Sequence, residues 1–592
     1  MWKQHLGSLE KEKLLKQPKI FLKNADAATG SILLDQPGYY VLEEDIIFRP
    51  NPDNDYSPLP SQAKKYAMAF RLGFFAALVV TSPHVVIDLN GHTIRQHAEH
   101  ALQQRFYANI ELGPAPFIPK KGPADFAKHF TPIHHCIVMN GTLGLASHHA
   151  IHGNGCQNVL IENVKMQDWE VGSIGINNGT NIFILNCTIP RNRVDVPILG
   201  IYSAGRFLRQ FLQGIIDSNA LPSIQAKGRR LLESLDVEMK QVFVEVMETG
   251  KTTHPLFRNP SGCVDGNVYG IVIHGIGPAV DDLQLAPPVP EAKVIVIDHV
   301  HLGHIENDVR EIVGLSYPSA ISGTDTPATS DSYNNEVQHD AAGAVFQVEL
   351  CGQGYTPNVI SEAQLFVAKY KEFSPNGNKS NISQGVLDWA SGTISWKQLW
   401  SQEKLQYIRN GDSMFHVQKG LMGIRVDEAD QVWITNCTMD HLENRGHLGT
   451  VAYGDYKTSH PKQRQLGYQG GVVRGICISG STNVHIHGNL IKTLKSHNSY
   501  IRGIDILNQS TVRLDNNQID QMQLCPHMGN KWLTYFKDKA PSMLPHQVPN
   551  PLPTTEPLHI SEDSTVYTQR ADYLDLIIAV FCLFFVLYYI KK

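Results

Sequence analysis

A six-residue pattern that recurs along the chain constrains the fold more than any other feature. It reads polar residue, Val or Ile, any residue, Ile or Leu, any residue, Asn, and it occurs at 158–163, 181–186, 431–436 and 511–516. A copy at 483–488 ends in Gly, and a looser copy at 294–299 ends in His. An isoleucine lies seven residues before five of these copies, at Ile151, Ile174, Ile424, Ile476 and Ile504. Each unit is therefore expected to hold two short strands, a turn and an Asn corner.

Strands this short are not stable alone, and their alternation turns every second side chain inward. Stacking equivalent strands about 4.8 Å apart pairs each backbone group with the coils above and below and builds one continuous core. Asparagines at the same corner of successive coils can form a hydrogen-bonded ladder. The pattern thus predicts a mainly β, parallel β-helix solenoid. Leucine-rich repeats need regularly spaced leucines, which this chain lacks.

With this pattern, the sequence resembles the right-handed parallel β-helix, or pectin-lyase-like, superfamily. The segment 85–94 is similar to an entry coil of such proteins, and the resemblance covers about residues 30–525. The resemblance implies a right-handed solenoid, and it suggests that the chain forms a homo-oligomer. It does not imply one function, because this fold hosts lyases, hydrolases, tailspikes and structural proteins. The Asn-Thr-Asp and Gly-His-Gly motifs of polygalacturonases are absent, so no catalytic residue is carried over.

The predicted organisation has four parts. Residues 1–82 form an N-terminal segment and cap, and 83–530 form the β-helix. Insertions interrupt the β-helix at about 203–250, where the period is helical, and at about 360–410. Residues 541–570 form a Pro-rich stalk, because prolines favour an extended chain. Long insertions of a solenoid often lie on its binding side, although they can equally cover exposed core.

The fourth part is a single C-terminal transmembrane helix at 573–590. Residues 576–590 are apolar and uncharged, and the whole stretch is near the lower limit of about 17 residues for a spanning helix. Tyr573, Tyr588 and Tyr589 suit the two interfaces of a bilayer. The charged N-terminus lacks the apolar core of a signal peptide, which predicts a body on the cytosolic side. Lys591 and Lys592 favour the opposite orientation, so the topology stays open.

Composition excludes several classes of protein. The 592 residues carry a net charge of −5, whereas a nucleic-acid-binding protein would show a basic excess, so no nucleic-acid partner is expected. Nine cysteines without a Cys-x-x-Cys pair argue against a disulfide scaffold, a zinc ribbon and a thioredoxin-type site. No cofactor is predicted.

Counting from the corner residue of each unit indicates a candidate site. The seventh residue after the corner is Glu170, Glu306 or Glu443 in three coils, and Arg193 or Lys495 in others. Carboxylates on adjacent coils would lie about 5 Å apart, and two coils apart about 10 Å. These distances bracket those of glycosidase acid/base pairs. The candidate catalytic residues are Glu170, Glu306, Glu443, Arg445, Asp168 and His441, and the alternative is an ordinary solvated turn.

Three functions follow, in order of preference. The first is a membrane-anchored β-helix with a structural, adhesive or glycan- or protein-binding role, since a rod on a stalk suits display. The second is a polysaccharide lyase or glycoside hydrolase acting in a groove of the β-helix. The third is a metal-handling protein, which requires three or four histidines to converge. The chain has 27 histidines, with runs at 134–135, 148–152 and 299–304.

Overall fold

The computed structural model describes the β-helix and parts of its excursions. The described residues are 2–51, 54–56, 75–104, 107–113, 133–192, 209, 212–218, 220–250, 268–275, 293–307, 315–316, 363, 366, 384–394, 414–415, 420–444, 473–496, 501–525 and 555–568. All statements about the structure refer to these residues.

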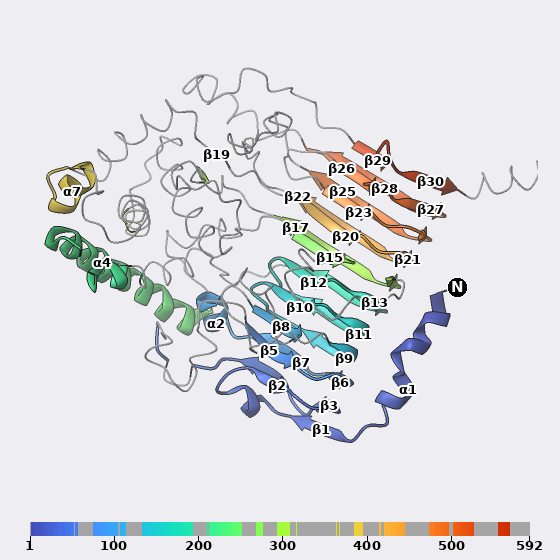
Figure 1. The fold of residues 1–592 in the computed structure, drawn as a ribbon, viewed down its shortest axis with the longest axis horizontal. Coiled ribbons are helices and arrows are strands. Elements are labelled where there is room, and N and C mark those ends of the chain that lie inside the picture. The colour runs from blue at the N-terminus through green and yellow to red at the C-terminus, as the bar shows by residue number, and fades with distance from the viewer. Residues whose placement is uncertain are drawn as a thin grey trace, which may run out of the picture.

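The strands stack as parallel coils into an 18-stranded and a 10-stranded sheet (Figure 1). A complete coil contributes one strand to the smaller sheet and then two to the larger one, which we call the first and second strands of the coil. In β9 (His134–Leu143) and β11 (Gln157–Gln167) one long strand covers both positions and bends at the corner. The chain therefore folds as a parallel β-helix, as the repeats predict.

The strands fall into three sets. The smaller sheet contains β2 (Ile32–Leu34), β5 (Phe75–Val80), β8 (Tyr107–Leu112), β10 (His149–Asn154), β12 (Gly172–Asn177), β15 (Val268–His274), β20 (Leu421–Asp427), β23 (Val473–Ser479), β26 (Ile501–Leu507) and β29 (Thr555–Ile560). The other first strands are β1 (Lys19–Leu22), β3 (Gly38–Leu42), β6 (Val85–Asp88), β13 (Thr180–Leu185), β16 (Val294–Asp298), β21 (Gln431–Thr435), β24 (Val484–His487), β27 (Thr511–Asp515) and β30 (Thr565–Thr568). The other second strands are β4 (Ile46–Phe48), β7 (Thr93–Gln96), β14 (Thr188–Arg191), β17 (His301–Asn307), β22 (Thr438–Asn444), β25 (Leu490–Ser496) and β28 (Gln518–Leu524).

The register of the strands confirms the repeat alignment. Ile184 pairs with Ile297, which pairs with Ile434 in the next coil, and all three side chains are fully buried. The isoleucines of the smaller sheet align in the same way, with Ile424 between Ile271 and Ile476. These inward columns form one apolar cluster that runs through the stack. Burying one such side chain contributes about 1.5–3 kcal/mol, so the core column stabilises every coil.

The predicted Asn corners are present. Asn163, Asn186, Asn436 and Asn516 all adopt the left-handed backbone conformation, which Asn tolerates better than most residues. Asn140, which the repeats did not predict, occupies the same corner in an earlier coil. Asn163 Nδ2 donates to Asn140 Oδ1 at 3.1 Å, and Asn140 Nδ2 donates to Asp88 Oδ1 at 3.2 Å. The ladder is therefore built in the early coils, while later coils place His299 or Gly488 at the same corner.

The β-helix is longer than predicted at both ends. β1 begins at Lys19, inside the predicted N-terminal segment. Within the predicted stalk over 541–570, residues 555–568 instead form β29 and β30, which pair with β26 and β27. Leu558 and Ile560 continue the inward columns, and Pro557 is accepted because β29 is an edge strand among the described residues. The high proline content of this segment led to the prediction of an extended stalk instead of a coil.

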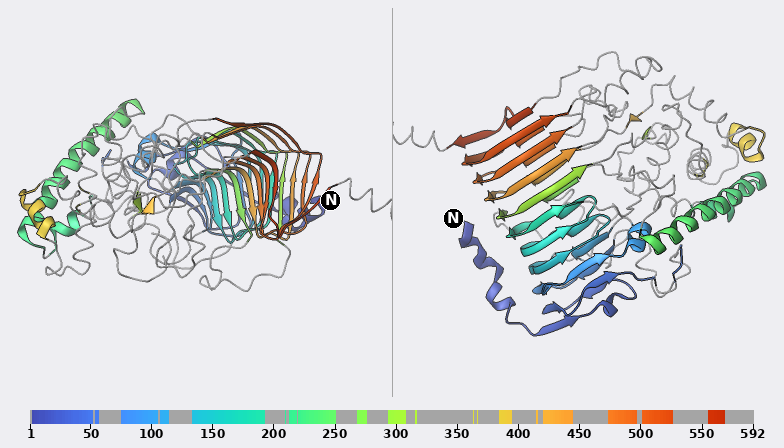
Figure 2. Two further views of the ribbon diagram at one scale, coloured as in Figure 1. Left: turned by 90° about the horizontal axis from the view of Figure 1, so that it is seen from above. Right: turned by 180° about the vertical axis from the view of Figure 1, so that it is seen from behind.

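Two long connections, from β8 to β9 and from β15 to β16, leave the stack between the smaller sheet and the first strands. The others leave at one corner, between the second strand of one coil and the smaller sheet of the next. Helix α4 (Pro222–Thr249) lies in one of these connections and packs against α2 (Ala98–Gln103) and α7 (Gln384–Ser391). α4 falls within the predicted insertion at 203–250, and α7 falls within that at 360–410. Figure 2 shows α4 and α7 on one side of the stacked coils. A short antiparallel pair, β18 (Leu315–Ser316) and β19 (Met414–Phe415), lies in another connection.

The N-terminal segment packs against the outer face of the first strands. It contains the 3₁₀ helix η1 (Trp2–Leu9) and α1 (Lys11–Leu14), and a further 3₁₀ helix, η2 (Asn24–Ala27), follows β1. Leu9 and Leu14 are buried in a second apolar cluster with outward residues of the first strands, and Lys11 forms an ion pair with Glu162. The first strands are thus buried on both faces in these coils.

Among the described residues, no helix combines the length and apolarity needed to cross a bilayer. The predicted anchor at 573–590 lies outside the described residues.

Candidate functional site

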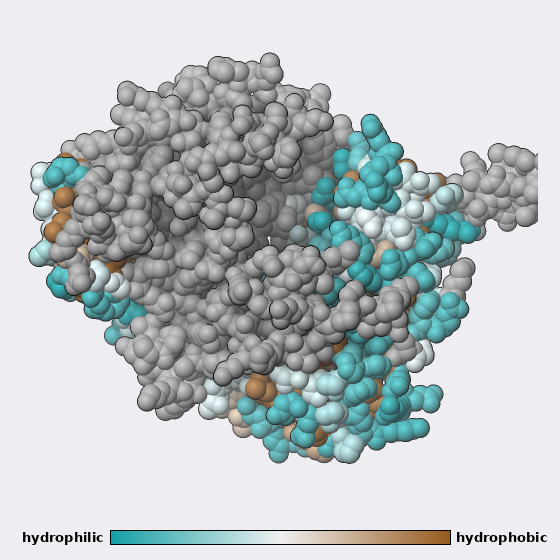
Figure 3. Space-filling view, viewed as in Figure 1, coloured by the Kyte–Doolittle hydropathy of each residue, from teal (hydrophilic) through white to brown (hydrophobic). Residues whose placement is uncertain are grey.

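Outward side chains of four successive second strands form a band that we call the polar strip. It lies beside the corner at which most of the long connections leave the stack. On the face shown in Figure 3, the described coils present mostly hydrophilic residues. The strip comprises Arg191 of β14, His301, His304 and Glu306 of β17, Asp440, His441 and Glu443 of β22, and Lys492 and Lys495 of β25.

The strand register places the predicted residues side by side. Glu306 pairs with Glu443, and Glu443 pairs with Lys495 in the following coil. His441 lies opposite His304, which lies opposite Arg191. Three of the six candidate residues, Glu306, His441 and Glu443, are therefore brought together on two adjacent coils.

Two basic side chains, His441 and Lys495, hold the carboxylate of Glu443 in place. Its side chain is only 2% exposed, His441 Nε2 lies 2.9 Å from Oε2, and Lys495 Nζ lies 3.0 Å from Oε1. Burial of a carboxylate is costly unless such partners compensate for lost water. The arrangement fixes the imidazole of His441 and the ammonium of Lys495 at the surface of the strip.

The two imidazoles of the strip stack on each other. The ring centroids of His304 and His441 are 4.5 Å apart, with an angle of 11° between the planes. His304 Nε2 is 3.6 Å from Glu306 Oε2, and half of the His304 side chain is exposed to solvent. The pair forms a flat surface between acidic groups.

A second polar cluster lies nearer the start of the same strands. Asp440 accepts from His301 Nε2 at 2.7 Å and pairs with Lys492 Nζ at 2.6 Å, so three successive coils are linked. Partial burial opposes ionisation of Asp440, but the hydrogen bonds from Lys492 and His301 hold its pKa below the usual value. Asp440 is thus a charged acceptor at neutral pH.

The remaining candidates lie elsewhere. Asp168 is on an earlier coil, where it forms an ion pair with Arg191 Nε at 2.8 Å. Glu170 is buried in the turn that follows Asp168, and it belongs to the coil two positions before that of Glu306. The structure therefore does not bring Glu170 to the Glu306–Glu443 pair. Arg445 lies outside the described residues.

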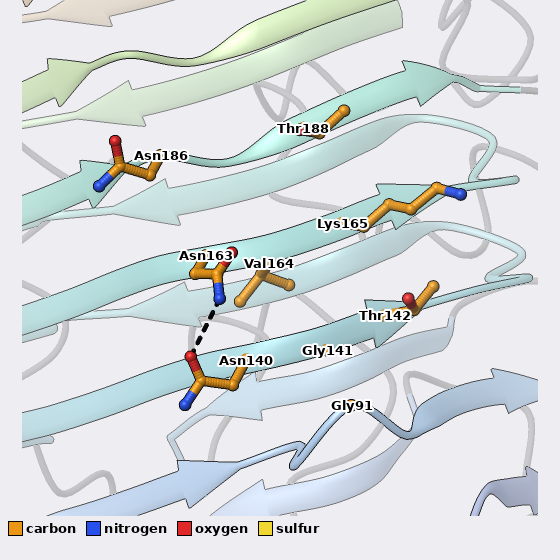
Figure 4. Close-up of a pocket in the computed structure, with 9 residues that line it drawn as sticks. All are labelled: Gly91, Asn140, Gly141, Thr142, Asn163, Val164, Lys165, Asn186 and Thr188. Atoms are coloured by element: carbon orange, nitrogen blue, oxygen red, sulfur yellow. Dashed lines mark hydrogen bonds between the residues drawn. The ribbon is translucent and has the colours of Figure 1, made fainter.

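A shallow depression of about 390 Å³ extends the polar surface towards the early coils (Figure 4). Lys165 projects there between Thr142 and Thr188, and Thr188 pairs with His301 of the polar strip. The residues that line the depression are Gly91, Asn140, Gly141, Thr142, Asn163, Val164, Lys165, Asn186 and Thr188. The Asn corners thus border a depression that ends at Thr188, next to the strip.

Counting from the corners missed several members of the strip. His301 and Lys492 both contact Asp440, which links three coils, and none of the three residues was a candidate. Their signal was present: they occupy the second and fourth positions after their corners, on the same outward face as the predicted residues. Cys187 and Cys437 are buried directly after their corners, and burial raises the pKa of both thiols to about 12.

Two groups of potential metal ligands occur among the described residues. In each group one ligand atom per residue lies within 4.8 Å of the others. The first group is His304, His441 and Glu443 of the polar strip, where the Lys495 ammonium already occupies one oxygen of Glu443. The second is His84, His134 and His135, which lies at another corner of the β-helix. Only the second group has no lysine bound to a ligand atom.

Comparisons with known proteins supply no family for this chain. No protein-family model matches the sequence, and no curated protein matches it. Among solved structures, a mutant tailspike protein of E. coli bacteriophage HK620 in complex with a pentasaccharide is 8% identical, with a TM-score of 0.19. That match covers 95% of this chain and 62% of the tailspike. PfbA, a surface adhesin of Streptococcus pneumoniae, is 8% identical over 85% of this chain and 86% of that one, with a TM-score of 0.18.

Proposed function

We propose that this protein is a membrane-anchored β-helix that binds a neutral oligosaccharide along the polar strip. One observation carries the proposal. Four successive coils present, in register, a stacked imidazole pair flanked by carboxylates, ammonium groups and a guanidinium.

The chemistry of the strip suits a sugar. Hydroxyl groups donate and accept hydrogen bonds, and the strip offers fixed acceptors at Asp440 and Glu306 beside donors at Lys492 and Lys495. The flat faces of His304 and His441 offer an apolar contact for one side of a sugar ring. Binding sites commonly combine such apolar surfaces with a few precisely placed polar groups.

The charge balance narrows the ligand class. Two acidic groups of the strip lie beside an ammonium group, Asp440 beside Lys492 and Glu443 beside Lys495, and Glu306 lies near His304. Arg191 of the strip lies beside Asp168 of the preceding coil. A polyanionic sugar would meet these carboxylates as well as the cations, and repulsion would oppose its binding. The strip therefore suits a neutral oligosaccharide better than a uronate polymer.

A glycoside hydrolase is the second candidate, because Glu306 and Glu443 pair directly on adjacent strands. Neighbouring strands lie about 4.8 Å apart, which is near the separation of about 5–5.5 Å used by retaining enzymes. However, the side chain of Glu443 is 2% exposed and bound by His441 and Lys495, which favours a positioning role for this carboxylate.

The proposal is tested with the full-length chain in detergent on an array of neutral and acidic oligosaccharides. Truncation at residue 540 is unsuitable, because it removes the coil of β29 and β30. We expect binding to neutral glycans, at least a tenfold loss in a His304→Ala/His441→Ala variant, and no loss in His487→Ala, which changes an exposed histidine of β24. Absence of binding to neutral glycans, or equal binding by the double variant, would contradict the proposal.

A parallel assay for new reducing ends tests the hydrolase. Cleavage that is abolished by Glu443→Gln, with unchanged thermal unfolding, would favour catalysis over binding alone. Cleavage by the variant at the rate of the unaltered chain would exclude Glu443 from the chemistry.

Anchoring at 573–590 stays part of the proposal. Deletion of residues 570–592 is expected to move the protein from the membrane fraction to the soluble fraction. Display to external glycans needs the body outside the cytosol, and a body on the cytosolic side is the alternative. Protease accessibility on intact cells decides between the two orientations, and cross-linking tests for a homo-oligomer.

A further inference from the structure

Three histidines meet where the smaller sheet leads into the first strands. His84 directly precedes β6, and the register of β6 with β9 places His84 opposite His135. The same column continues with Asn158 and Asn181 in the next two coils. All four residues adopt the left-handed conformation, with φ between 52° and 59°. The position is thus one corner column of the β-helix.

The two halves of this column differ in chemistry. Asn181 Nδ2 donates to Asn158 Oδ1 at 3.0 Å, which is the ladder expected at such a corner. The two earlier coils instead carry His84 and His135, whose rings stack with centroids 4.9 Å apart and an angle of 22° between the planes. Asparagine suits the backbone conformation at least as well, so the corner geometry does not require histidine.

His134 completes the group. Its Nδ1 lies 2.9 Å from Nδ1 of His135, and its ring centroid lies 5.1 Å from that of His84. The backbone fixes this arrangement, because His84 N–H donates to the carbonyl oxygen of His134 at 3.0 Å. One nitrogen from each ring lies within 4.8 Å of the other two. Three imidazole nitrogens are therefore already gathered at one point.

We propose that His84, His134 and His135 bind one Zn²⁺ ion. Three imidazoles with a fourth open position are an established ligand set for zinc. The N-terminal segment passes beside this site: Gln17 Nε2 donates to the carbonyl oxygen of His84 at 3.1 Å. Glu10 is close enough for the charges of His84 and His135 to lower its pKa, although its main partner is Lys13. Because Lys13 already binds Glu10, water is the ligand expected at the fourth position.

Such an ion would join two coils and the loop between them. His84 and His134 lie at the two ends of a chain segment that includes β6, β7, α2 and β8. Closing this segment through a metal would stabilise the folded state, because the unfolded chain loses entropy when its ends are linked. The proposed ion is independent of the polar strip, which lies on the second strands.

The asparagines of the next two coils in this column indicate which substitution to test. In His84→Asn/His135→Asn both corners receive the residue that the next two coils carry, so the fold is expected to be retained. His299→Asn is the matched control, because His299 is also a left-handed corner residue but pairs with Asp298. Zinc content is measured on the full-length chain after loading with ZnCl₂ and dialysis, and Co²⁺ absorption reports the ligand geometry.

We expect the unaltered chain and His299→Asn to retain one more equivalent of zinc than the double variant. Zinc should also raise their thermal unfolding temperature more than that of the double variant. Any ion bound by His304, His441 and Glu443 stays in all three proteins, so the difference isolates the corner site. Should the double variant fail to fold, His134→Gln replaces it, because Gln157 occupies that position in the next coil. Equal zinc contents in the folded variant and the unaltered chain would overturn the proposal.

Discussion

The two halves of the larger sheet share an inward face but differ on their outward face. On the first strands, one outward column runs through Tyr39, Val86, Ile137, Leu160, Phe183, Val296 and Trp433, and the N-terminal segment covers it. The second strands present charged and imidazole side chains on the equivalent face. Beyond Trp433, which His5 contacts, the first-strand column continues as His485 and Arg513. The change coincides with the end of the covering segment.

This difference shows which residues set the fold and which set its contacts. Both halves obey the same inward pattern of Ile, Val and Leu, so both stack in the same way. The outward positions are free of that constraint. Where the chain covers its own sheet they are apolar, as expected for strands buried on both faces, and elsewhere they are polar and available to a ligand.

The largest difference in stability between the two halves is expected at Phe183, which is fully buried although it points outward. We expect Phe183→Ala to lower the free energy of unfolding by about 3–5 kcal/mol, because it leaves a cavity under the N-terminal segment. On the other half, His304→Ala should cost less than about 1 kcal/mol, because half of that side chain is exposed. Urea denaturation compares the two variants, and similar losses would refute the distinction between the halves.

A smaller effect is expected at Gly303, on the second strands beside His304. A Cβ atom there would collide with the carbonyl oxygen of Pro190 in the preceding coil. We expect Gly303→Ala to destabilise the protein by about 1–3 kcal/mol, because backbone rather than a flexible side chain must move. Gly214→Ala is the control, since a Cβ there meets open space. Equal stability of the two variants would mean that the coils separate more easily than the geometry indicates.

The corner between the two halves offers a finer test at Asn163. Its φ is 55°, and its side chain donates to Asn140. Asn163→Ala is expected to cost about 1–2 kcal/mol from backbone strain, with a further loss of the ladder hydrogen bond. Asn163→Gly removes only the hydrogen bond, so thermal unfolding should place it between the alanine variant and the unaltered chain. A glycine variant no more stable than the alanine variant would assign the cost to the ladder.

The smallest expected effect is a difference in pH dependence. The lowered pKa of His84 and His134 gives stability that is present above their unfolded value of about 6.5 and is lost as pH falls. The lowered pKa of Asp440 gives stability that is present above about 3.9 and is lost below it. Glu10 and Lys13 of the N-terminal segment face the histidine corner and modulate its titration.

Unfolding temperatures measured with chelator between pH 7 and 5 should therefore fall less in His84→Asn/His135→Asn than in the unaltered chain. Asp440→Asn should be less stable than the unaltered chain at pH 7, and this difference should shrink only below about pH 5. If the histidine variant shows the full loss between pH 7 and 5, other groups control the acid response.

Much of the fold was predictable because each coil repeats the same local requirement. Ile184, Ile297 and Ile434 were aligned from the hexapeptide alone, and so were the corners at Asn163, Asn186 and Asn436. The coil of β29 escaped this reasoning, because the proline content of the segment favoured a stalk. The coil that begins at Val85 was recognised, but the pairing of His84 with His135 was missed, although Val85 pairs with Cys136.

The candidate site was predictable only in part. Counting from corners placed Glu306, Glu443 and Lys495 in one column, because the second strands of these coils start at the same distance from their corners. Asp168 and Glu170 fell out of register, since the pairing of β11 with β14 shifts between Lys165 and Gln167. Contacts such as His301 with Asp440 join residues that lie far apart in the sequence, so no local count could identify them.

The sequence by itself determined the inward columns, the corners and the order of the coils, because these depend on alternation and on backbone conformation within a few residues. The tertiary structure alone decided which outward groups meet. Adjacent coils are separated by connections of very different length, such as 308–420 between β17 and β20, and only backbone pairing across those connections sets the register. The tertiary structure also decided that residues 2–15 cover the first strands of the larger sheet. The sequence of a strand shows that its outward side chains are apolar, but it does not show which other segment buries them.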